Sequence, residues 1–170
     1  MDRLWSPWRY GYVSKAGPAD ACIFCQKAAQ SLDRENFLVH RARFNFVILN
    51  LYPYTTGHLM IAPYAHQPTL EALPEETLHE MISLARRAEI HLRALYKPQG
   101  LNLGVNVGEC AGAGVAGHIH MHVLPRWSAD SNFMTTIGET RVLPESLDVT
   151  YGKLLARFKE EALPAPQEPL

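Results

Sequence analysis

The feature that most limits how this chain can fold is a strict alternation of histidines and apolar residues, His-Ile-His-Met-His-Val, at positions 118–123. On a β-strand alternate side chains share one face, so His118, His120 and His122 would lie together and the apolar residues would face the core. On a helix the same spacing would spread the imidazoles over about 200°. The alternation therefore predicts a strand over residues 118–124, in a sheet with one buried face.

The segment before these histidines indicates what they could act on. Residues 108–117 contain four glycines and three alanines, and successive backbone N–H groups in such a loop can form a concave site for an anion. Histidine has a pKa near neutrality, so it can act as a nucleophile at physiological pH. Imidazoles beside an anion site favour attack at phosphorus. Two alternatives stay open: a metal site made by the three histidines, and a purely structural role.

Other segments predict the rest of the fold. β-branched and aromatic runs indicate strands at 37–40, 44–51, 58–63 and 101–107. A long helix is expected between Pro74 and Pro98, and a short C-terminal helix over 146–162. The apolar face of the long helix would consist of Leu78, Met81, Ile82, Ala85, Ala88, Leu92 and Leu95. Several antiparallel strands with one long helix after the third predict an α+β fold.

Length and charge restrict the classes of protein to consider. A chain of 170 residues, 47% of them hydrophobic, can form one domain with its own core. We expect an aromatic N-terminal arm at 1–20, the main domain at 21–145, the C-terminal helix at 146–162 and a flexible tail at 163–170. A formal net charge of -1 argues against a nucleic-acid partner and against a basic membrane-surface protein. No apolar run reaches the length of a membrane span.

The cysteines point to a reducing compartment and to a second site. Three cysteines do not form a disulfide framework, and the first residues lack a signal-peptide pattern, so we expect a cytoplasmic protein. Cys22 and Cys25 form a Cys-x2-Cys pair, which is half of a structural zinc site. The spacing alone leaves open that the two are simply reduced thiols.

The motif His118-Ile119-His120-Met121-His122-Val123-Leu124 resembles the signature of the histidine triad (HIT) family of nucleotide hydrolases and transferases. The resemblance extends back through ILNLYPYTTGHLMIAP at 48–63. The segments LWSPWR, GECAGAGVAG and NFM further resemble a bacterial branch of diadenosine-tetraphosphate phosphorylases or hydrolases. The resemblance implies a HIT-like antiparallel sheet and an enzyme that cleaves a dinucleoside polyphosphate, such as diadenosine tetraphosphate. It also implies a homodimer that pairs across the helix and a strand.

The resemblance assigns a role to each histidine of the motif region. His120 corresponds to the nucleophile, which forms a nucleotidyl-histidine that water or phosphate then cleaves. His122 corresponds to a histidine that hydrogen-bonds phosphate or leaving-group oxygens. His58 matches a supporting position behind these residues, although a histidine that merely starts a strand would look the same. No catalytic metal is implied.

Nucleotide contacts follow from the same resemblance. Asn50 aligns with a residue that hydrogen-bonds the ribose hydroxyls. Asn106 and the amides near Ala113 and Gly114 would stabilise charge on the transferred phosphoryl group. Many relatives carry glutamine or serine where this chain has Gly114, so backbone N–H groups must take over that contact. This departure leaves the choice between water and phosphate as acceptor open.

Some zinc-bearing relatives complete a tetrahedral site with two histidines, which here are His66 and His118. We therefore expect Cys22, Cys25, His66 and His118 to hold a structural zinc. Two other classes of function compete with the enzyme. One is a non-catalytic module that binds AMP, and the other is a metal-binding protein that uses the three alternating histidines. The remaining histidines, at positions 40, 79 and 91, are expected at the surface.

Overall fold

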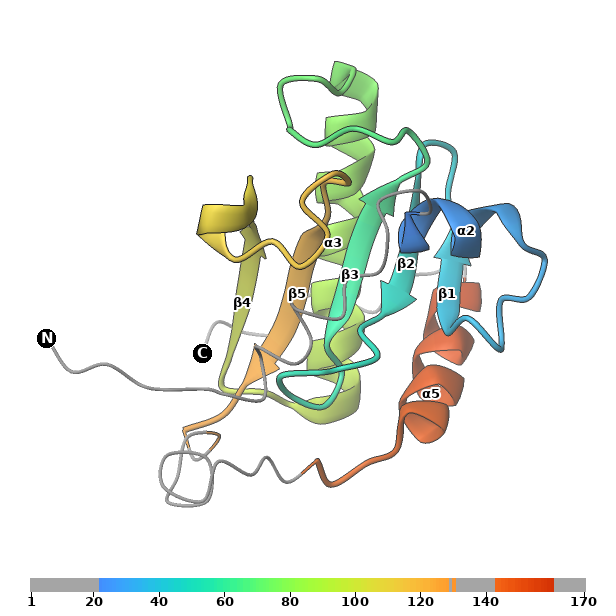
Figure 1. Cartoon of the computed structure of the whole chain (residues 1–170). Coiled ribbons are helices and arrows are strands. Elements are labelled where there is room, and N and C mark those ends of the chain that lie inside the picture. Colours follow the sequence, from blue (N-terminus) through green and yellow to red (C-terminus); the bar gives the residue numbers. More distant parts are fainter. Residues whose placement is uncertain (1–21, 129, 131–142, 161–170) are drawn as a thin grey trace, which may run out of the picture.

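The computed structural model describes residues 22–128, 130 and 143–160. This part of the chain forms one five-stranded antiparallel sheet in the order β1-β2-β3-β5-β4 (Figure 1). The strands are β1 (Leu38–Arg41), β2 (Asn45–Leu49), β3 (Leu59–Pro63), β4 (Gly100–Val105) and β5 (Met121–Arg126). The helices are α2 (Ile23–Ala29), α3 (Glu75–Tyr96) and α5 (Leu147–Lys159), with a 3-10 turn at Glu109–Ala111. The predicted α+β fold, with one long helix and a short C-terminal helix, is confirmed.

The arm predicted at 1–20 and the tail predicted at 163–170 lie outside the described residues, so the proposed division of the chain stays a prediction. No helix in the described ranges is long and apolar enough to span a membrane.

The sheet separates two apolar clusters. Figure 1 shows α3 crossing behind the strands, and this face carries the larger cluster, to which α5 also contributes Tyr151, Leu154 and Phe158. The opposite face carries a smaller cluster around Phe24 of α2, with Leu38, Phe46, Ile48 and Ala62. Both faces of β2 are therefore buried, which explains its apolar run from Phe46 to Leu49. The second face is where α2 approaches the histidines.

The turn between β2 and β3 depends on one glycine. Gly57 has φ +83°, and a Cβ at this position would lie 2.9 Å from Cδ2 of Leu92 on α3. Only glycine combines that backbone conformation with such a close approach to the helix. The turn places His58 directly before β3.

The predicted strand over 118–124 is wrong at its start, because β5 begins only at Met121. The N–H of His118 donates to the carbonyl of Val115, and the N–H of Ile119 donates to the carbonyl of Gln67. These two residues are therefore held by loops and not by a neighbouring strand. The alternation itself persists, since Ile119, Met121 and Val123 belong to the cluster beneath α3.

Two predictions on α3 are also wrong. Ile82 was placed on the apolar face but is 60% exposed, and His91 was expected at the surface but is 0% exposed. The His91 ring packs edge-on against Phe158 of α5, with 4.9 Å between centroids. The periodicity of one helix cannot show where a second helix will cover it. His79 is exposed as expected, whereas His40 is half-buried in β1.

Candidate functional site

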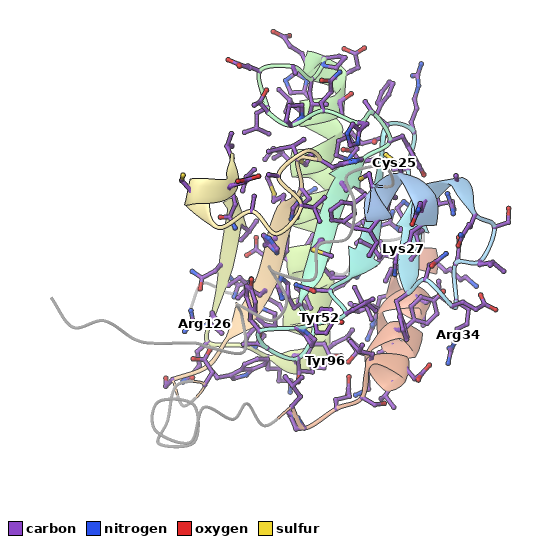
Figure 2. All side chains as sticks on the ribbon, in the orientation of Figure 1. Cys25, Lys27, Arg34, Tyr52, Tyr96 and Arg126 are labelled. Atoms are coloured by element: carbon purple, nitrogen blue, oxygen red, sulfur yellow. The ribbon has the colours of Figure 1, made fainter. Side chains whose placement is uncertain are left out.

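The site is a row of aromatic and imidazole rings. One end of the row lies near Cys25 and the other near the turn that contains Tyr52, and Figure 2 labels these two residues. Successive rings along the row have centroids between 4.7 and 5.2 Å apart. In order they are His66, His118, Phe24, His120, His122 and His58. Residues from four separate segments thus meet on the face of the sheet opposite α3.

His120 is buried, and one hydrogen bond determines its tautomer. Its Nδ1 lies 2.8 Å from the carbonyl oxygen of His118. A carbonyl can only accept, so Nδ1 carries the proton and Nε2 holds the free lone pair. Burial lowers the pKa of His120, and the hydrogen bond to the carbonyl offsets this only in part. A neutral imidazole with an unprotonated Nε2 is the form able to attack an electrophile.

His122 is fixed in the opposite tautomer by a chain of hydrogen bonds. The backbone N–H of Tyr54 donates to Nδ1 of His58 at 3.1 Å, so the proton of His58 is on Nε2. That Nε2 lies 2.9 Å from Nδ1 of His122 and donates to it. The proton of His122 is therefore on its Nε2, which can donate to an oxygen. Its ring lies 4.9 Å from that of His120, so a nucleophile and a hydrogen-bond donor stand side by side.

The two predicted asparagines contact different parts of the site. Asn50 follows β2, with its Nδ2 3.4 Å from Nδ1 of His58 and its Oδ1 accepting from the N–H of Tyr52. Asn106 follows β4 and donates to the carbonyl of Gly112 in the glycine-rich loop, at 3.4 Å. The structure thus joins Asn50 to the histidines and Asn106 to the loop.

Ala113 and Gly114 lie in that loop, between the 3-10 turn and His118. The described hydrogen bonds within it run from Ala111 to Gly108 and from Gly112 to Glu109. None of the described hydrogen bonds connects Ala113 or Gly114 with His120. Their contact with a phosphate stays a prediction.

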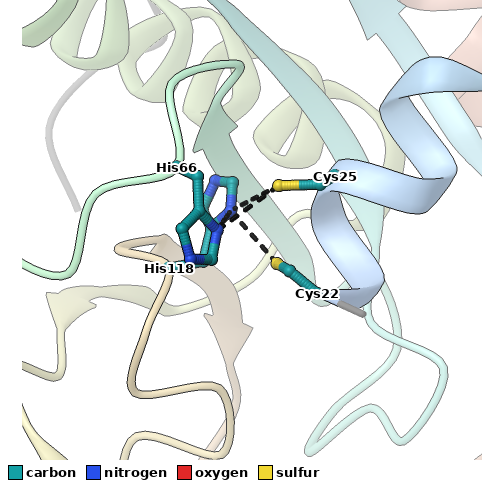
Figure 3. A group of neighbouring side chains, drawn as sticks. All are labelled: Cys22, Cys25, His66 and His118. Atoms are coloured by element: carbon teal, nitrogen blue, oxygen red, sulfur yellow. Dashed lines mark hydrogen bonds between the residues drawn. The ribbon is translucent and has the colours of Figure 1, made fainter. Parts of the chain in front are cut away.

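The four predicted metal ligands come together at one point. Cys22, Cys25, His66 and His118 place their ligand atoms within 4.8 Å of one another (Figure 3). Nδ1 of His118 lies 3.2 Å from Sγ of Cys22 and 3.5 Å from Sγ of Cys25. Nδ1 of His66 lies 3.4 Å from Sγ of Cys25 and 3.3 Å from Nδ1 of His118.

The four separations that involve Nδ1 of His118 or His66 fit a tetrahedral zinc ion. Bond lengths of about 2.0 Å to nitrogen and 2.3 Å to sulfur imply about 3.3 Å between two nitrogens and about 3.5 Å between nitrogen and sulfur. The outward nitrogen of His118 supports the same conclusion, because its Nε2 donates to the carbonyl of Pro63 at 2.9 Å. That bond leaves Nδ1 unprotonated and turned toward the cysteines, as is usual for a histidine that binds a metal. His120 and His122 are not part of this group.

The sequence does not predict one residue of the row. Phe24 is 3% exposed, and its ring lies 5.2 Å from that of His118 and 4.7 Å from that of His120. A signal was available, since Phe24 stands between the two cysteines. Without knowledge of the short helix α2, nothing indicated which way its ring would point.

Comparison with known proteins agrees with this geometry. The family model of the HIT domain matches residues 33–129. The chain is 36% identical over 154 residues to a Mycobacterium tuberculosis protein named AP-4-A phosphorylase, covering 86% of this chain and 79% of the relative. It is 28% identical to the asymmetrical bis(5'-nucleosyl)-tetraphosphatase of Schizosaccharomyces pombe, over 54% of this chain and 50% of that protein.

Among solved structures, a Zn-bound histidine triad family protein from Mycobacterium smegmatis matches with a TM-score of 0.65 and 26% identity, covering 81% of this chain and 92% of that one. The fold, the alternating histidines and the extent of these matches lead to one conclusion: the chain belongs to the HIT domain family.

Proposed function

We propose that this enzyme cleaves a dinucleoside polyphosphate, such as diadenosine tetraphosphate, through a nucleotidyl intermediate on His120. Nε2 of His120 attacks the α-phosphorus, a nitrogen–phosphorus bond forms, and the bond to the bridging oxygen breaks. The electron pair leaves with that oxygen, which becomes a terminal phosphate oxygen of the departing nucleotide (ATP from diadenosine tetraphosphate), while Nε2–H of His122 donates a hydrogen bond to it. The observation on which the proposal rests is the hydrogen bond from Nδ1 of His120 to the His118 carbonyl.

The same hydrogen bond supports the intermediate. Once Nε2 of His120 is bonded to phosphorus the imidazole carries a positive charge, and the carbonyl of His118 faces its Nδ1–H. A preorganised acceptor at this point stabilises charge that develops only during the reaction. Attack by water or phosphate on phosphorus then breaks the nitrogen–phosphorus bond and returns the electron pair to Nε2.

Binding of the nucleotide involves residues beside His58 and residues in or next to the glycine-rich loop. Asn50, already held beside His58, would bind the ribose hydroxyls. Asn106 and the backbone N–H groups of Ala113 and Gly114 would bind the phosphate oxygens, since a glycine-rich loop can present several amides to one anion. The M. tuberculosis relative is named a phosphorylase, which favours phosphate over water as the acceptor.

We also propose that Cys22, Cys25, His66 and His118 hold one zinc ion. Four protein ligands close the coordination sphere, so the ion would supply structural stability and no open position for chemistry. Metal analysis should find about one zinc per chain in the wild type and in His120→Ala, and none in Cys22→Ala. Loss of the metal in His120→Ala would instead support a site made by the alternating histidines.

The quaternary structure and location are proposals of the same kind. β4 is an edge strand of the sheet, and Leu103 on it is 47% exposed. An exposed apolar edge strand is a surface that proteins usually cover. We infer that a second copy covers it and that the exposed Ile82 of α3 lies in the same interface. Cys22, Cys25 and Cys110 form no disulfide among the described residues, in keeping with a cytoplasmic location.

Product analysis with and without inorganic phosphate tests the proposed reaction. Diadenosine tetraphosphate should give ATP and ADP only when phosphate is present if the enzyme is a phosphorylase. ATP and AMP would identify a hydrolase that attacks the α-phosphorus. ADP without phosphate would identify a hydrolase that cleaves centrally and would contradict attack at the α-phosphorus. Binding of AMP without cleavage of any dinucleoside polyphosphate would contradict the proposal and identify a nucleotide-binding module.

A further inference from the structure

The short helix α2 has few interactions of its own that could hold it in place. It spans seven residues, and its N-terminal Cys22 makes no side-chain capping hydrogen bond. Phe24 is its only buried residue. A helix of this length is not stable in isolation. At its C-terminal end Arg41 of β1 donates to the carbonyl of Ala28 at 2.7 Å. At its N-terminal end its position on the sheet depends on Phe24 and on Cys22 and Cys25.

Those two cysteines belong to the metal cluster. Cys22 and Cys25 lie within hydrogen-bonding distance of His118, and Cys25 also of His66. A metal bound there would tie both ends of the Cys-Ile-Phe-Cys segment to residues after β3 and before β5. Phe24 would be held between two ligands of the same ion.

Phe24 is also the ring that packs on the nucleophile. Its centroid lies 4.7 Å from that of His120 at an interplanar angle of 42°. Rotation of the imidazole about its Cβ–Cγ bond would take Nδ1 away from the carbonyl of His118, and the Phe24 ring stands against that rotation. At 3% exposed, Phe24 offers little surface to a substrate, so its contacts favour a role inside the protein.

We infer that Phe24 is a positioning residue for His120 and that the metal cluster acts on the nucleophile through it. This inference rests on the proposed function of His120 and on the proposed zinc. The cluster reaches His120 by two routes, the ring of Phe24 and the backbone carbonyl of His118, whose side chain is itself a ligand. Binding of the structural metal thus helps to fix the orientation of the reacting imidazole.

Two variants of Phe24 and one matched control test this. Phe24→Leu and Phe24→Met keep an apolar side chain but remove the flat ring, and either suffices if the other fails to fold. Phe46→Leu makes the same change in the same apolar cluster, one ring further from His120. With zinc loaded, the Phe24 variants should lower kcat about 10- to 100-fold with little change in KM. Phe46→Leu should keep kcat close to that of the wild type.

A second readout does not depend on turnover. Nitrogen NMR of His120 should show the Nδ1–H tautomer in the zinc-loaded wild type and in Phe46→Leu. It should show a mixture of tautomers in the Phe24 variants and in wild type stripped of zinc by a chelator under reducing conditions. Because one route is already broken, stripping should lower kcat by a smaller factor in Phe24→Leu than in the wild type.

Several outcomes would overturn the inference. If the Phe24 variants raise KM and leave kcat unchanged, the ring contacts the nucleotide and does not position His120. If they keep the wild-type tautomer, or if zinc removal has the same effect on kcat with and without the ring, Phe24 does not link the two sites. A wild type that shows the tautomer effects but cleaves no nucleotide would refute the proposed function alone.

Discussion

One ring nitrogen of a neutral imidazole can act either as a nucleophile or as a hydrogen-bond donor. Which role it takes depends on the atom that faces the other ring nitrogen. At His120 that atom is a carbonyl oxygen, so the outer nitrogen keeps its lone pair. At His122 it is an N–H of His58, so the outer nitrogen keeps its proton. Two residues of the same type, two positions apart, are thereby given complementary roles. The difference arises entirely from their hydrogen-bond partners.

The role of His58 can be tested by removing its donor. In His58→Phe, Nδ1 of His122 loses the N–H that faces it, and the proton of His122 is no longer held on Nε2. We expect kcat for dinucleoside polyphosphate cleavage to fall at least about 10-fold, while KM changes little. The exposed His79 offers a control, since His79→Phe should leave both constants unchanged. A wild-type kcat in His58→Phe would mean that His58 only begins a strand.

His91 links stability to pH. Its two ring nitrogens are buried and have no hydrogen-bond partner within the described part of the chain. Burial, together with the positive charge of the nearby Arg87, lowers the pKa of His91 from 6.5 to about 4. The unfolded chain therefore binds a proton at this residue between those two pH values while the folded chain does not. The contribution of neutral His91 to the free energy of unfolding is fully present above the pKa of the unfolded state. It is lost as pH falls toward the pKa of the folded state.

Because of His91, we expect the free energy of unfolding of the wild type to fall by about 2 kcal/mol when the pH is lowered from about 7.5 to about 5. His91→Leu cannot take up the proton and should lose correspondingly less over the same interval. Urea denaturation of both proteins at the two pH values measures the difference. Equal losses in the two proteins would show that His91 is protonated in the folded state as readily as in the unfolded one.

At the scale of elements, hydrogen bonds to a single carboxylate on α3 hold the β1–β2 turn in place. Glu80 accepts hydrogen bonds from the backbone N–H groups of Arg43, Phe44 and Asn45, all between 2.8 and 3.0 Å. It also accepts from the side-chain amide of Asn45. These hydrogen bonds lower the pKa of Glu80 although burial alone would raise it. One side chain thus satisfies the backbone of a turn far away in sequence.

Glu80→Ala leaves these N–H groups without their partner. We expect a loss of about 2 to 4 kcal/mol in unfolding free energy, since hydrogen bonds to a charged group are stronger than neutral ones. The exposed Glu71 provides the comparison, because Glu71→Ala should change stability by less than about 0.5 kcal/mol. Thermal and urea denaturation measure both. A loss in Glu80→Ala no larger than in the control would mean that water replaces the carboxylate at no cost.

The elements that sequence could predict are those whose pattern repeats along the chain. The five strands and α3 have enough apolar residues at regular spacing to show their faces. α2 does not, since it has one buried residue in seven. The start of β5 was missed because His118 is held by Val115 and the metal cluster, contacts that no local pattern shows. His66 and His118 are 52 positions apart, so only the family resemblance could join them.

At the scale of the whole molecule, the sheet supports a different task on each face. One face packs α3 and α5 into the main core. The other carries the row of rings from the metal cluster to the β2–β3 turn, with α2 as its cover (Figures 1 and 3). In the described part of the chain no strand pairs with the outer side of β4, where we propose that a second copy binds.

Leu103→Glu tests that interface. A charged side chain on β4 would be buried without a partner in the proposed dimer, so light scattering coupled to size-exclusion chromatography should report a monomer. Leu32→Glu changes an equally exposed leucine, 50% against 47%, away from β4 and should remain dimeric. A wild type that is monomeric at micromolar concentration would refute the dimer.

The most direct test of the central claim is the capture of the covalent intermediate. Zinc-loaded enzyme is mixed with diadenosine tetraphosphate, quenched during the first turnover and examined by intact-mass spectrometry and peptide mapping. We predict one added adenylate on the peptide that contains His120, and no addition in His120→Ala. Product formed in a single turnover without any adduct, or full activity in His120→Ala, would contradict the account.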